Sequence, residues 1–301
     1  MARAEPIQEF MYTPVWREFA PPSHIEIEII STCNRQCIYC PVAVLESHTR
    51  DLLPENLFHE LIDSLVSMGF TGTIGTAVLC EPLLDRRCVE LFSYARSRLP
   101  GSKIHLATNG DALTPKLITE LLSRAFTTIR ITEHDPVHKK ADVIAAFLRQ
   151  HPEYYPRVSI LKYAWTENTL NWAGVYSDGR PNPSYAARCP FYEGSVVDAW
   201  GNVLLCCNDA FFARRENRQE SRPLDNLANR PFEKIWKDSA ATRASLFNGT
   251  HVDKFEICQK CTGTTTSLSS TSLRPSNKKG VRHSLRAGAE KVLGRLSRIG
   301  S

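Results

Sequence analysis

The stretch that decides the fold is HIEIEIISTCNRQCIYC, residues 24–40, in which a strand-like run leads directly into three closely spaced cysteines. Residues 24–31 are rich in β-branched side chains with alternating acids, which predicts a first strand. Cys33, Cys37 and Cys40 follow in the spacing C-x3-C-x2-C, and no fourth cysteine stands nearby. Active sites of parallel α/β proteins are built on the loops that leave their strands, so this loop is the first candidate site.

Strand-like and helix-like segments alternate along the chain up to about residue 162. Besides 24–31, the pattern predicts strands over 73–79, 103–108, 127–132 and 157–162, and helices over 54–68, 86–99, 114–125 and 136–150. Five strands that alternate with four helices indicate parallel βαβ units, in a barrel or a doubly wound sheet.

The alternation stops before a Gly-, Pro- and Asn-rich segment, residues 171–188, which predicts a linker. Residues 195–206 predict a β-hairpin that turns near Gly201, and residues 231–250 predict one or two short helices. The last residues recover a helical apolar stripe with basic flanks. We therefore divide the chain into an N-terminal extension (1–23), a barrel (24–165), a linker with a small second domain (166–264) and a basic tail (265–301).

The composition is that of an ordinary globular protein, with 42% hydrophobic and 23% charged residues among 301. No run of about 18 apolar residues occurs, so we expect no membrane span. The N-terminus carries acids and Pro6 where a signal peptide has its apolar core, so we expect a cytoplasmic protein. In that reducing compartment, clustered thiols among the ten cysteines bind metal more often than they form disulfides.

The net charge of +5 is unevenly distributed. Residues 262–301 carry eight Lys or Arg and one acid, Glu290, so residues 1–261 sum to −2. A body with this charge does not suit a nucleic-acid binder, and we expect no nucleic acid as a partner.

A second group of cysteines lies far downstream and comprises Cys189, one of the neighbours Cys206 and Cys207, Cys258 and Cys261. Four thiolates make a closed site that suits either zinc or an iron–sulfur cubane. Zinc in the first group would need a fourth ligand, for which His48 is the near candidate. Three thiolates on a cubane instead leave one iron open for an added ligand.

Three motifs at successive strand ends resemble those of the radical SAM enzymes. They are the C-x3-C-x2-C loop with the aromatic Tyr39 before its last cysteine, CEPLLD (80–85) and ATNGDAL (107–113). The likeness extends over about residues 24–263, to members that oxidise an aminocyclitol alcohol in antibiotic biosynthesis. It implies a partial (βα)6 TIM-like barrel, S-adenosyl-L-methionine (SAM) and a [4Fe–4S] cluster on the three cysteines.

The resemblance also implies which residues bind SAM. Glu81 is expected to take the amino group, because a carboxylate accepts ammonium donors. The other residues expected around SAM or the substrate are Tyr39, Asn109, Thr132, Glu133 and His134. From the sequence alone, Asn109 is equally a turn residue before Gly110, and His134 fits a polar helix approach better than a catalytic base.

The second cysteine group resembles the auxiliary-cluster domains called SPASM and twitch. Cys189, Gly201 and Cys206 match the spacing of these domains, which selects Cys206 over Cys207. The resemblance then implies a second [4Fe–4S] cluster, held by Cys189, Cys206, Cys258 and Cys261. A full SPASM domain has more cysteines, so we expect the shorter twitch form, a β-hairpin plus a helix.

Two reactions remain open under the resemblance. In both, a 5′-deoxyadenosyl radical takes a hydrogen atom from a carbinol carbon of a sugar, aminocyclitol or nucleoside. A dehydrogenase would oxidise this carbon to a ketone and pass the electron to the auxiliary cluster. An epimerase would return a hydrogen atom to the opposite face from a thiol, for which Cys207 and Cys80 are spare.

Both spare thiols are also explained as buried packing residues. Cys80 stands where the family has a glycine before Glu81. Trp172 replaces an arginine of the family's Asn-Arg-Gly-Gly segment, and its indole offers an apolar face to a sugar ring or a base.

Two other classes of protein have less support. A peptide-modifying SPASM enzyme would carry a recognition domain ahead of the barrel, where 23 residues stand before the first strand. A zinc-binding nucleic-acid protein would use the basic tail, but the body is close to neutral. If the chain is a radical SAM enzyme, we expect a small carbohydrate-like substrate and a flavodoxin or ferredoxin as the reductant.

Overall fold

The computed structural model describes residues 20–261, except 38, 46–48, 77, 135–138, 163–171, 174, 176–187 and 215–222. Within this part, a sheet of eight strands runs in the order β5-β4-β3-β2-β1-β6-β7-β8. His48, the predicted tail and most of the predicted linker and N-terminal extension lie outside the described residues. The helices of the described part include none long and apolar enough to cross a membrane.

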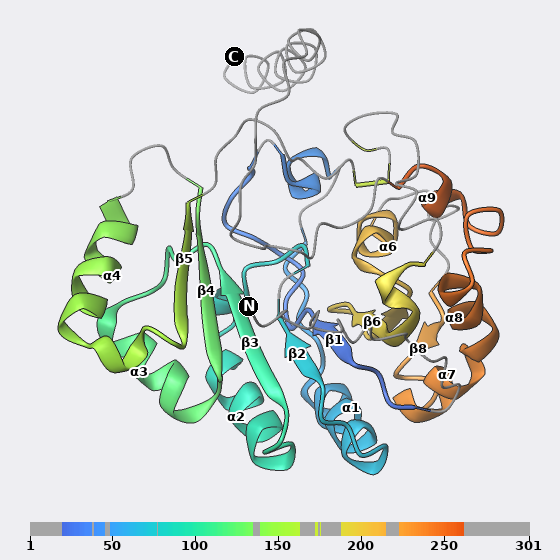
Figure 1. Ribbon diagram of the computed structural model, residues 1–301, viewed down its shortest axis with the longest axis horizontal. Coiled ribbons are helices and arrows are strands. Elements are labelled where there is room, and N and C mark those ends of the chain that lie inside the picture. The colour runs from blue at the N-terminus through green and yellow to red at the C-terminus, as the bar shows by residue number, and fades with distance from the viewer. Residues whose placement is uncertain are drawn as a thin grey trace, which may run out of the picture.

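The first five strands are parallel and alternate with helices, which confirms the predicted order. Figure 1 shows the four helices along one face of the curved sheet. The strands are β1 (His24–Ile27), β2 (Thr73–Gly75), β3 (Lys103–Thr108), β4 (Thr128–Glu133) and β5 (Val158–Lys162). The helices are α1 (Glu55–Ser67), α2 (Cys88–Arg98), α3 (Pro115–Arg124) and α4 (Lys139–Gln150), and the 3-10 helix η3 (Pro152–Tyr154) precedes β5.

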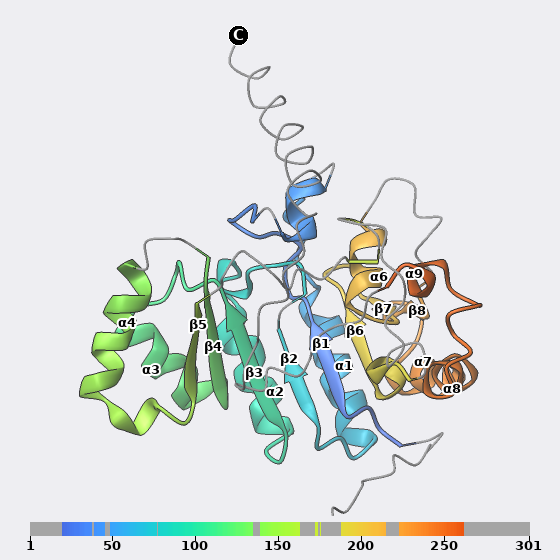
Figure 2. The ribbon, with the colours of Figure 1, turned by 45° about the horizontal axis from the view of Figure 1, so that its top comes forward.

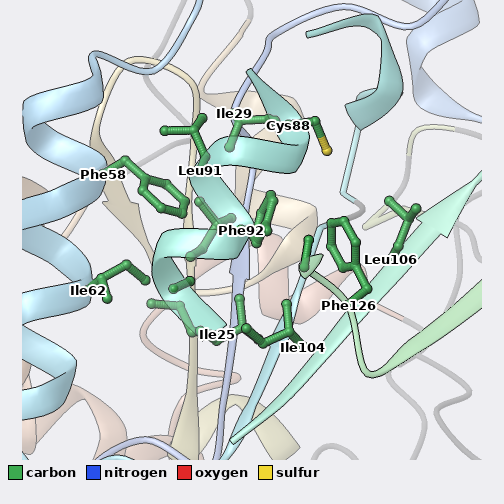
Figure 3. Packing of buried hydrophobic residues seen from close by; sticks show 14 of the residues in the cluster. Ile25, Ile29, Phe58, Ile62, Cys88, Leu91, Phe92, Ile104, Leu106 and Phe126 are labelled. Carbon is green, nitrogen blue, oxygen red and sulfur yellow. The ribbon is translucent and has the colours of Figure 1, made fainter. Parts of the chain in front are cut away.

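The main hydrophobic core lies between the sheet and these helices (Figure 3). Phe92 of α2 has its ring 5.4 Å from that of Phe58 in α1 and 5.0 Å from that of Phe126. All three rings are fully buried, together with Ile25 of β1 and Ile104 of β3. Truncating one such aromatic ring to alanine costs about 3–5 kcal/mol, so this core holds the strand ends in place.

Two strands end earlier than the sequence predicts. β1 stops at Ile27 rather than 31, and β2 stops at Gly75 rather than 79. The Glu28 amide still donates to Val197 O (2.8 Å), but the amide of Leu79 donates to the Glu28 carboxylate (2.6 Å) instead of to a neighbouring strand. Where β1 and β2 pass into loops, the Glu28 side chain thus accepts a hydrogen bond that a backbone carbonyl of a neighbouring strand would otherwise accept.

The predicted hairpin is present and joins the same sheet. It consists of β6 (Gly194–Val197) and β7 (Asn202–Leu204), with Gly201 at φ +81° in the turn. β6 pairs in parallel with β1, and β7 pairs antiparallel with β8 (Asp225–Asn226). The predicted short helices are α7 (Phe232–Asp238) and α8 (Ala240–Phe247). The remaining elements are α6 (Cys207–Phe212), α9 (Glu256–Gln259) and the 3-10 helices η1 (Pro41–Val44), η2 (Pro82–Leu84) and η4 (Pro190–Glu193).

Candidate active site

The first three cysteines lie on the loop between β1 and η1, which we call the cluster loop (residues 31–40). In Figure 2 this blue segment stands over the carboxyl ends of the strands, next to α6. Two donors approach the Cys33 sulfur, the Arg35 amide at 3.4 Å and Asn109 Nδ2 at 3.8 Å. Burial raises the pKa of the Cys33 thiol, and it raises the pKa of Cys40 to about 12. Thiols in such surroundings ionise when a cation binds them, as metal ligands do.

An ion pair fastens the cluster loop to the turn after β3. Arg35 makes a bidentate pair with Asp111, with Nε 2.7 Å from Oδ2 and Nη2 2.6 Å from Oδ1. Asn34 Nδ2 also donates to Asp111 Oδ2 (2.7 Å), and Asn109 Nδ2 donates to Asn34 Oδ1 (2.8 Å). Asn109 therefore contacts the cluster loop and also shapes its own turn, in which Gly110 has φ +78°.

Glu81 lies at the start of η2 with its carboxylate turned into the strand ends. The residue is 2% exposed, and its oxygens accept from Thr108 Oγ1 (2.8 Å), Asn109 N (2.8 Å) and Leu83 N (3.1 Å). Burial raises the pKa of this carboxyl, and the three donors act in the opposite direction. A carboxylate offers about four acceptor sites, so capacity remains for one more donor.

The end of β4 approaches the cluster loop through an aromatic contact. The Tyr39 hydroxyl is hydrogen-bonded to Nδ1 of His134, and the two ring centroids are 5.8 Å apart. Thr132 is half-buried and Glu133 is buried on the preceding residues of the strand. Because successive side chains of a strand point to opposite faces, Thr132 and Glu133 meet different surroundings.

The second group of cysteines is gathered around α6. Cys189 precedes η4, Cys206 precedes α6, and Cys258 lies in α9 shortly before Cys261. Burial raises the pKa of Cys189 to about 11, and the charge of Cys261 adds to the effect. Asn208 Nδ2 donates to the sulfur of Cys261 (3.1 Å).

Both cysteine groups border one hydrophobic cluster, which includes Val42 of η1, Phe211 of α6 and Ile257 of α9. The thiols packed against it are Cys33, Cys40, Cys189, Cys206, Cys207, Cys258 and Cys261. Members of both groups therefore pack against the same apolar cluster.

The two spare thiols lie in different places. Cys207 belongs with the second group: burial raises its pKa to about 12, and the charge of Cys261 is the next cause. The Cys80 thiol donates to Thr76 O (3.6 Å), next to Glu81, and burial raises its pKa as well. Each therefore keeps its proton at neutral pH. Trp172 has φ +48° and packs half-buried against the hydrophobic cluster shared by the cysteine groups.

Four residues that the sequence did not single out also build this site. Arg35 and Asp111 fasten the cluster loop, and Glu28 and Arg214 form a buried ion pair of 2.5 Å beneath it. Asp111 stands inside the ATNGDAL motif and could have been found there. Arg214 lies in a run of charged residues that predicts an exposed surface.

A cavity of about 380 Å³ lies between the cluster loop and the hairpin. Thr32 and Cys33 line it from the loop, and Trp200, Asn202 and Arg214 line it from the hairpin and the residues after α6.

Family comparisons agree with this arrangement of two cysteine sites. The Radical SAM superfamily matches residues 27–145, and the SPASM iron–sulfur cluster-binding domain matches residues 189–262. This chain is a radical SAM enzyme. Its two matched segments contain all seven cysteines assigned to the two groups, and the second match favours iron–sulfur over zinc for the downstream group.

One curated relative is similar along most of its length. The S-adenosyl-L-methionine-dependent 2-deoxy-scyllo-inosamine dehydrogenase of Niallia circulans is 26% identical over 247 residues, which are 79% of this chain and 92% of the relative. The crystal structure of BtrN in complex with AdoMet and 2-DOIA has a TM-score of 0.68 at 25% identity and covers 81% of this chain and 94% of that chain. BtrN in an open conformation has a TM-score of 0.56 at 23% identity, with 79% and 91% covered.

The radical SAM enzyme uses SAM and two [4Fe–4S] clusters, one in each matched domain. The residues present fit these groups. Each cysteine group offers soft sulfur ligands in largely apolar surroundings, and each has at least one N–H donor directed at a sulfur, as iron–sulfur sites use to set their potential. Near the first group, the buried Glu81 carboxylate offers an acceptor for the amino group of SAM.

Proposed function

We propose that this radical SAM enzyme oxidises a carbinol carbon of an aminocyclitol, or of a closely related sugar-like molecule, to a ketone in natural-product biosynthesis. The observation that carries the proposal is the match to a 2-deoxy-scyllo-inosamine dehydrogenase over 92% of its length, both cysteine groups included. After hydrogen-atom transfer, the carbinol radical must still lose the hydroxyl proton and one electron to become the ketone. The auxiliary cluster, whose four irons would all have cysteine ligands, would accept this electron.

When bound, SAM and its cluster supply the 5′-deoxyadenosyl radical that removes the carbinol hydrogen atom, and the auxiliary cluster supplies the acceptor for the remaining electron. The chain binds and orients the clusters, SAM and the substrate, and it excludes water from them. Cys33, Cys37 and Cys40 would hold the SAM cluster, and Cys189, Cys206, Cys258 and Cys261 the auxiliary one. The shared hydrophobic cluster supports this role, because excluding water protects a radical from side reactions.

We assign the SAM amino group to Glu81, whose carboxylate is buried and fixed by three donors. Asn109 and Thr132 would line the ribose side, whereas Glu133 points to the opposite, buried face of β4. Tyr39 and His134, which are joined by a hydrogen bond, would contribute to the SAM site from the cluster loop and the end of β4. The Trp172 indole would stack on the ring of the substrate.

An epimerase is the second candidate, and Cys80 is the observation that favours it. Its thiol stays protonated next to Glu81, so an S–H bond is available near the proposed SAM site. Cys207 is the other possible donor, although its position among the auxiliary cysteines suits it less well.

We further propose a flavodoxin or ferredoxin as the electron donor to the SAM cluster. None of the ten cysteines is joined in a disulfide in the structure. Cysteines stay reduced, and so available as cluster ligands, in a reducing compartment, which supports a cytoplasmic location.

Anaerobic turnover in deuterated water, with 2-deoxy-scyllo-inosamine and a panel of related aminocyclitols and sugars, tests the proposal. The dehydrogenase predicts a ketone, whose carbonyl carbon no longer carries hydrogen, and one 5′-deoxyadenosine per ketone. An inverted alcohol that carries solvent deuterium on carbon would establish the epimerase instead. Formation of 5′-deoxyadenosine with no change in any of these compounds would refute this substrate class.

A further inference from the structure

A buried ion pair connects the auxiliary-cluster part of the chain to the first strand. Glu28, directly after β1, has a side chain that is 0% exposed, and the Arg214 side chain is 4% exposed. Arg214 Nη2 lies 2.5 Å from Glu28 Oε2, while Glu28 Oε1 accepts from the Leu79 amide at 2.6 Å. Both carboxylate oxygens are therefore engaged, one by each of two distant segments.

The other arm of the Arg214 guanidinium holds two backbone carbonyls. Nη1 donates to Ser31 O (2.9 Å) and to Leu79 O (3.1 Å). Ser31 stands two residues before Cys33, and Leu79 stands two residues before Glu81. One side chain thus fixes the starts of the two loops that carry the SAM-cluster ligand and the acceptor for the SAM amino group.

The two loops are also joined to each other next to this arginine. The Glu81 amide donates to Thr32 O (3.0 Å), so a shift of one loop start moves the other. A planar guanidinium with donors in a fixed fork suits this task, because it can hold a carboxylate and two carbonyls at set angles. Lysine offers a single ammonium and cannot occupy the same three directions.

Stability alone does not account for the pair. Removing two charges from water costs about as much as their attraction returns, and apolar residues of similar volume often replace a buried pair without loss. What an apolar replacement cannot supply is a donor for the carbonyls of Ser31 and Leu79. The geometry points to a role in setting the shape of the loops.

Arg214 follows α6, which begins directly after the auxiliary-cluster ligand Cys206. Its amide donates to Phe211 O (3.1 Å), and Phe211 is buried in the hydrophobic cluster shared by both cysteine groups. A displacement of α6 would therefore also displace Arg214, which lies two residues after the end of the helix.

We propose that Arg214 is a positioning residue of the SAM site, supplied by the auxiliary-cluster domain and acting through the backbone of Ser31 and Leu79. The proposal rests on SAM binding at the cluster loop, which the family assignment gives, and not on the product that the enzyme forms. It also means that the barrel's SAM site is complete only when the second domain is docked against it.

The test uses the full-length, anaerobically reconstituted enzyme without substrate. SAM affinity is read from the change that SAM causes in the electron paramagnetic resonance spectrum of the reduced cluster. The variants are Arg214→Met and Arg214→Lys, and iron per chain is measured for each. Arg243→Met is the matched control, because Arg243 is also buried (2% exposed) and also donates to a backbone carbonyl, Trp236 O (3.1 Å) in α7, and not to Ser31 or Leu79.

We expect Arg214→Met to retain iron and to weaken SAM binding about tenfold or more, since displacing a site by about 1 Å has effects of this order. Arg214→Lys keeps a charge opposite Glu28 and should fold even where the Met variant does not; its SAM affinity should fall about as far. Arg243→Met should lower the melting temperature and leave SAM affinity unchanged. SAM affinity within twofold of wild type in Arg214→Lys, or an equal loss in Arg243→Met, would overturn the proposal.

Discussion

Replacing Asp111 by Asn should loosen the cluster loop without unfolding the barrel. Asp111 holds the loop through a bidentate pair with Arg35 and a third bond from Asn34, all between 2.6 and 2.7 Å. The amide of Asn retains one acceptor oxygen but loses the charge and the second oxygen. The loop then lacks its charged anchor on the turn after β3.

The magnitude follows from the burial of the pair. Hydrogen bonds to charged groups contribute about 1.5–3 kcal/mol, and exposed ion pairs contribute less than about 1 kcal/mol. The side chains of Arg35 and Asp111 are 18% and 27% exposed, which places the pair between these cases. We therefore expect a loss of about 2 kcal/mol, equivalent to about a thirtyfold larger open population of the loop.

The assay is the release of iron to a chelator from the reconstituted enzyme. Two phases are expected, one from each cluster, and the phase that SAM slows belongs to the cluster loop. Asp111→Asn should accelerate that phase about thirtyfold and leave the other unchanged. Asp63→Asn is the control, because Asp63 also pairs with an arginine, Arg98, but at an exposed and distant position. Equal rates for the two variants, or acceleration of both phases together, would refute the reasoning.

Three further predictions follow from single side chains. Glu81→Gln should weaken SAM binding by about a hundredfold. The amide group of Gln would direct N–H donors toward the three donors that the carboxylate now accepts, and each donor left without an acceptor costs about 1–3 kcal/mol. An unchanged SAM titration would exclude Glu81 from the site. Cys206→Ser should lose about four irons per chain whereas Cys207→Ser should keep them, and the reverse result would exchange the two assignments. Burial, and then the charge of Arg130, lower the pKa of His105 from 6.5 to about 4. Between these pH values the unfolded chain binds the extra proton and the folded chain does not, so the free energy of unfolding should fall as pH falls from 6.5 to 4. His105→Asn should flatten this dependence in thermal melts, and an unchanged slope would contradict it.

The alternation of strands and helices could be predicted because each element carries its own hydrophobic period. The cysteine loop, CEPLLD and ATNGDAL could be placed near one another because parallel strands bring their carboxyl ends to the same edge. The structure agrees, since Asn109 reaches Cys33 and Glu81 accepts from Thr108 and Asn109.

The features that were missed depend on contacts between distant segments. The sequence of 195–206 predicts a hairpin but not its pairing with β1, because the free edge of β1 exists only after the sheet has formed. Arg214 stands among charged residues that indicate a solvated surface, yet its side chain is buried against Glu28. The early ends of β1 and β2 have the same cause, because Glu28 takes the Leu79 amide.

The domain boundary near residues 165 and 166 stays a prediction, since residues 163–171 lie outside the described part. The basic tail, residues 265–301, also lies outside the described part.

Turnover of 2-deoxy-scyllo-inosamine that carries deuterium on its carbinol carbons tests the central claim most directly. The reaction is run anaerobically with SAM and a chemical reductant. A radical SAM dehydrogenase predicts 5′-deoxyadenosine that has gained one deuterium, together with an equal amount of ketone. Unlabelled 5′-deoxyadenosine, or labelled 5′-deoxyadenosine without ketone, would contradict the claim that this chain oxidises an aminocyclitol alcohol.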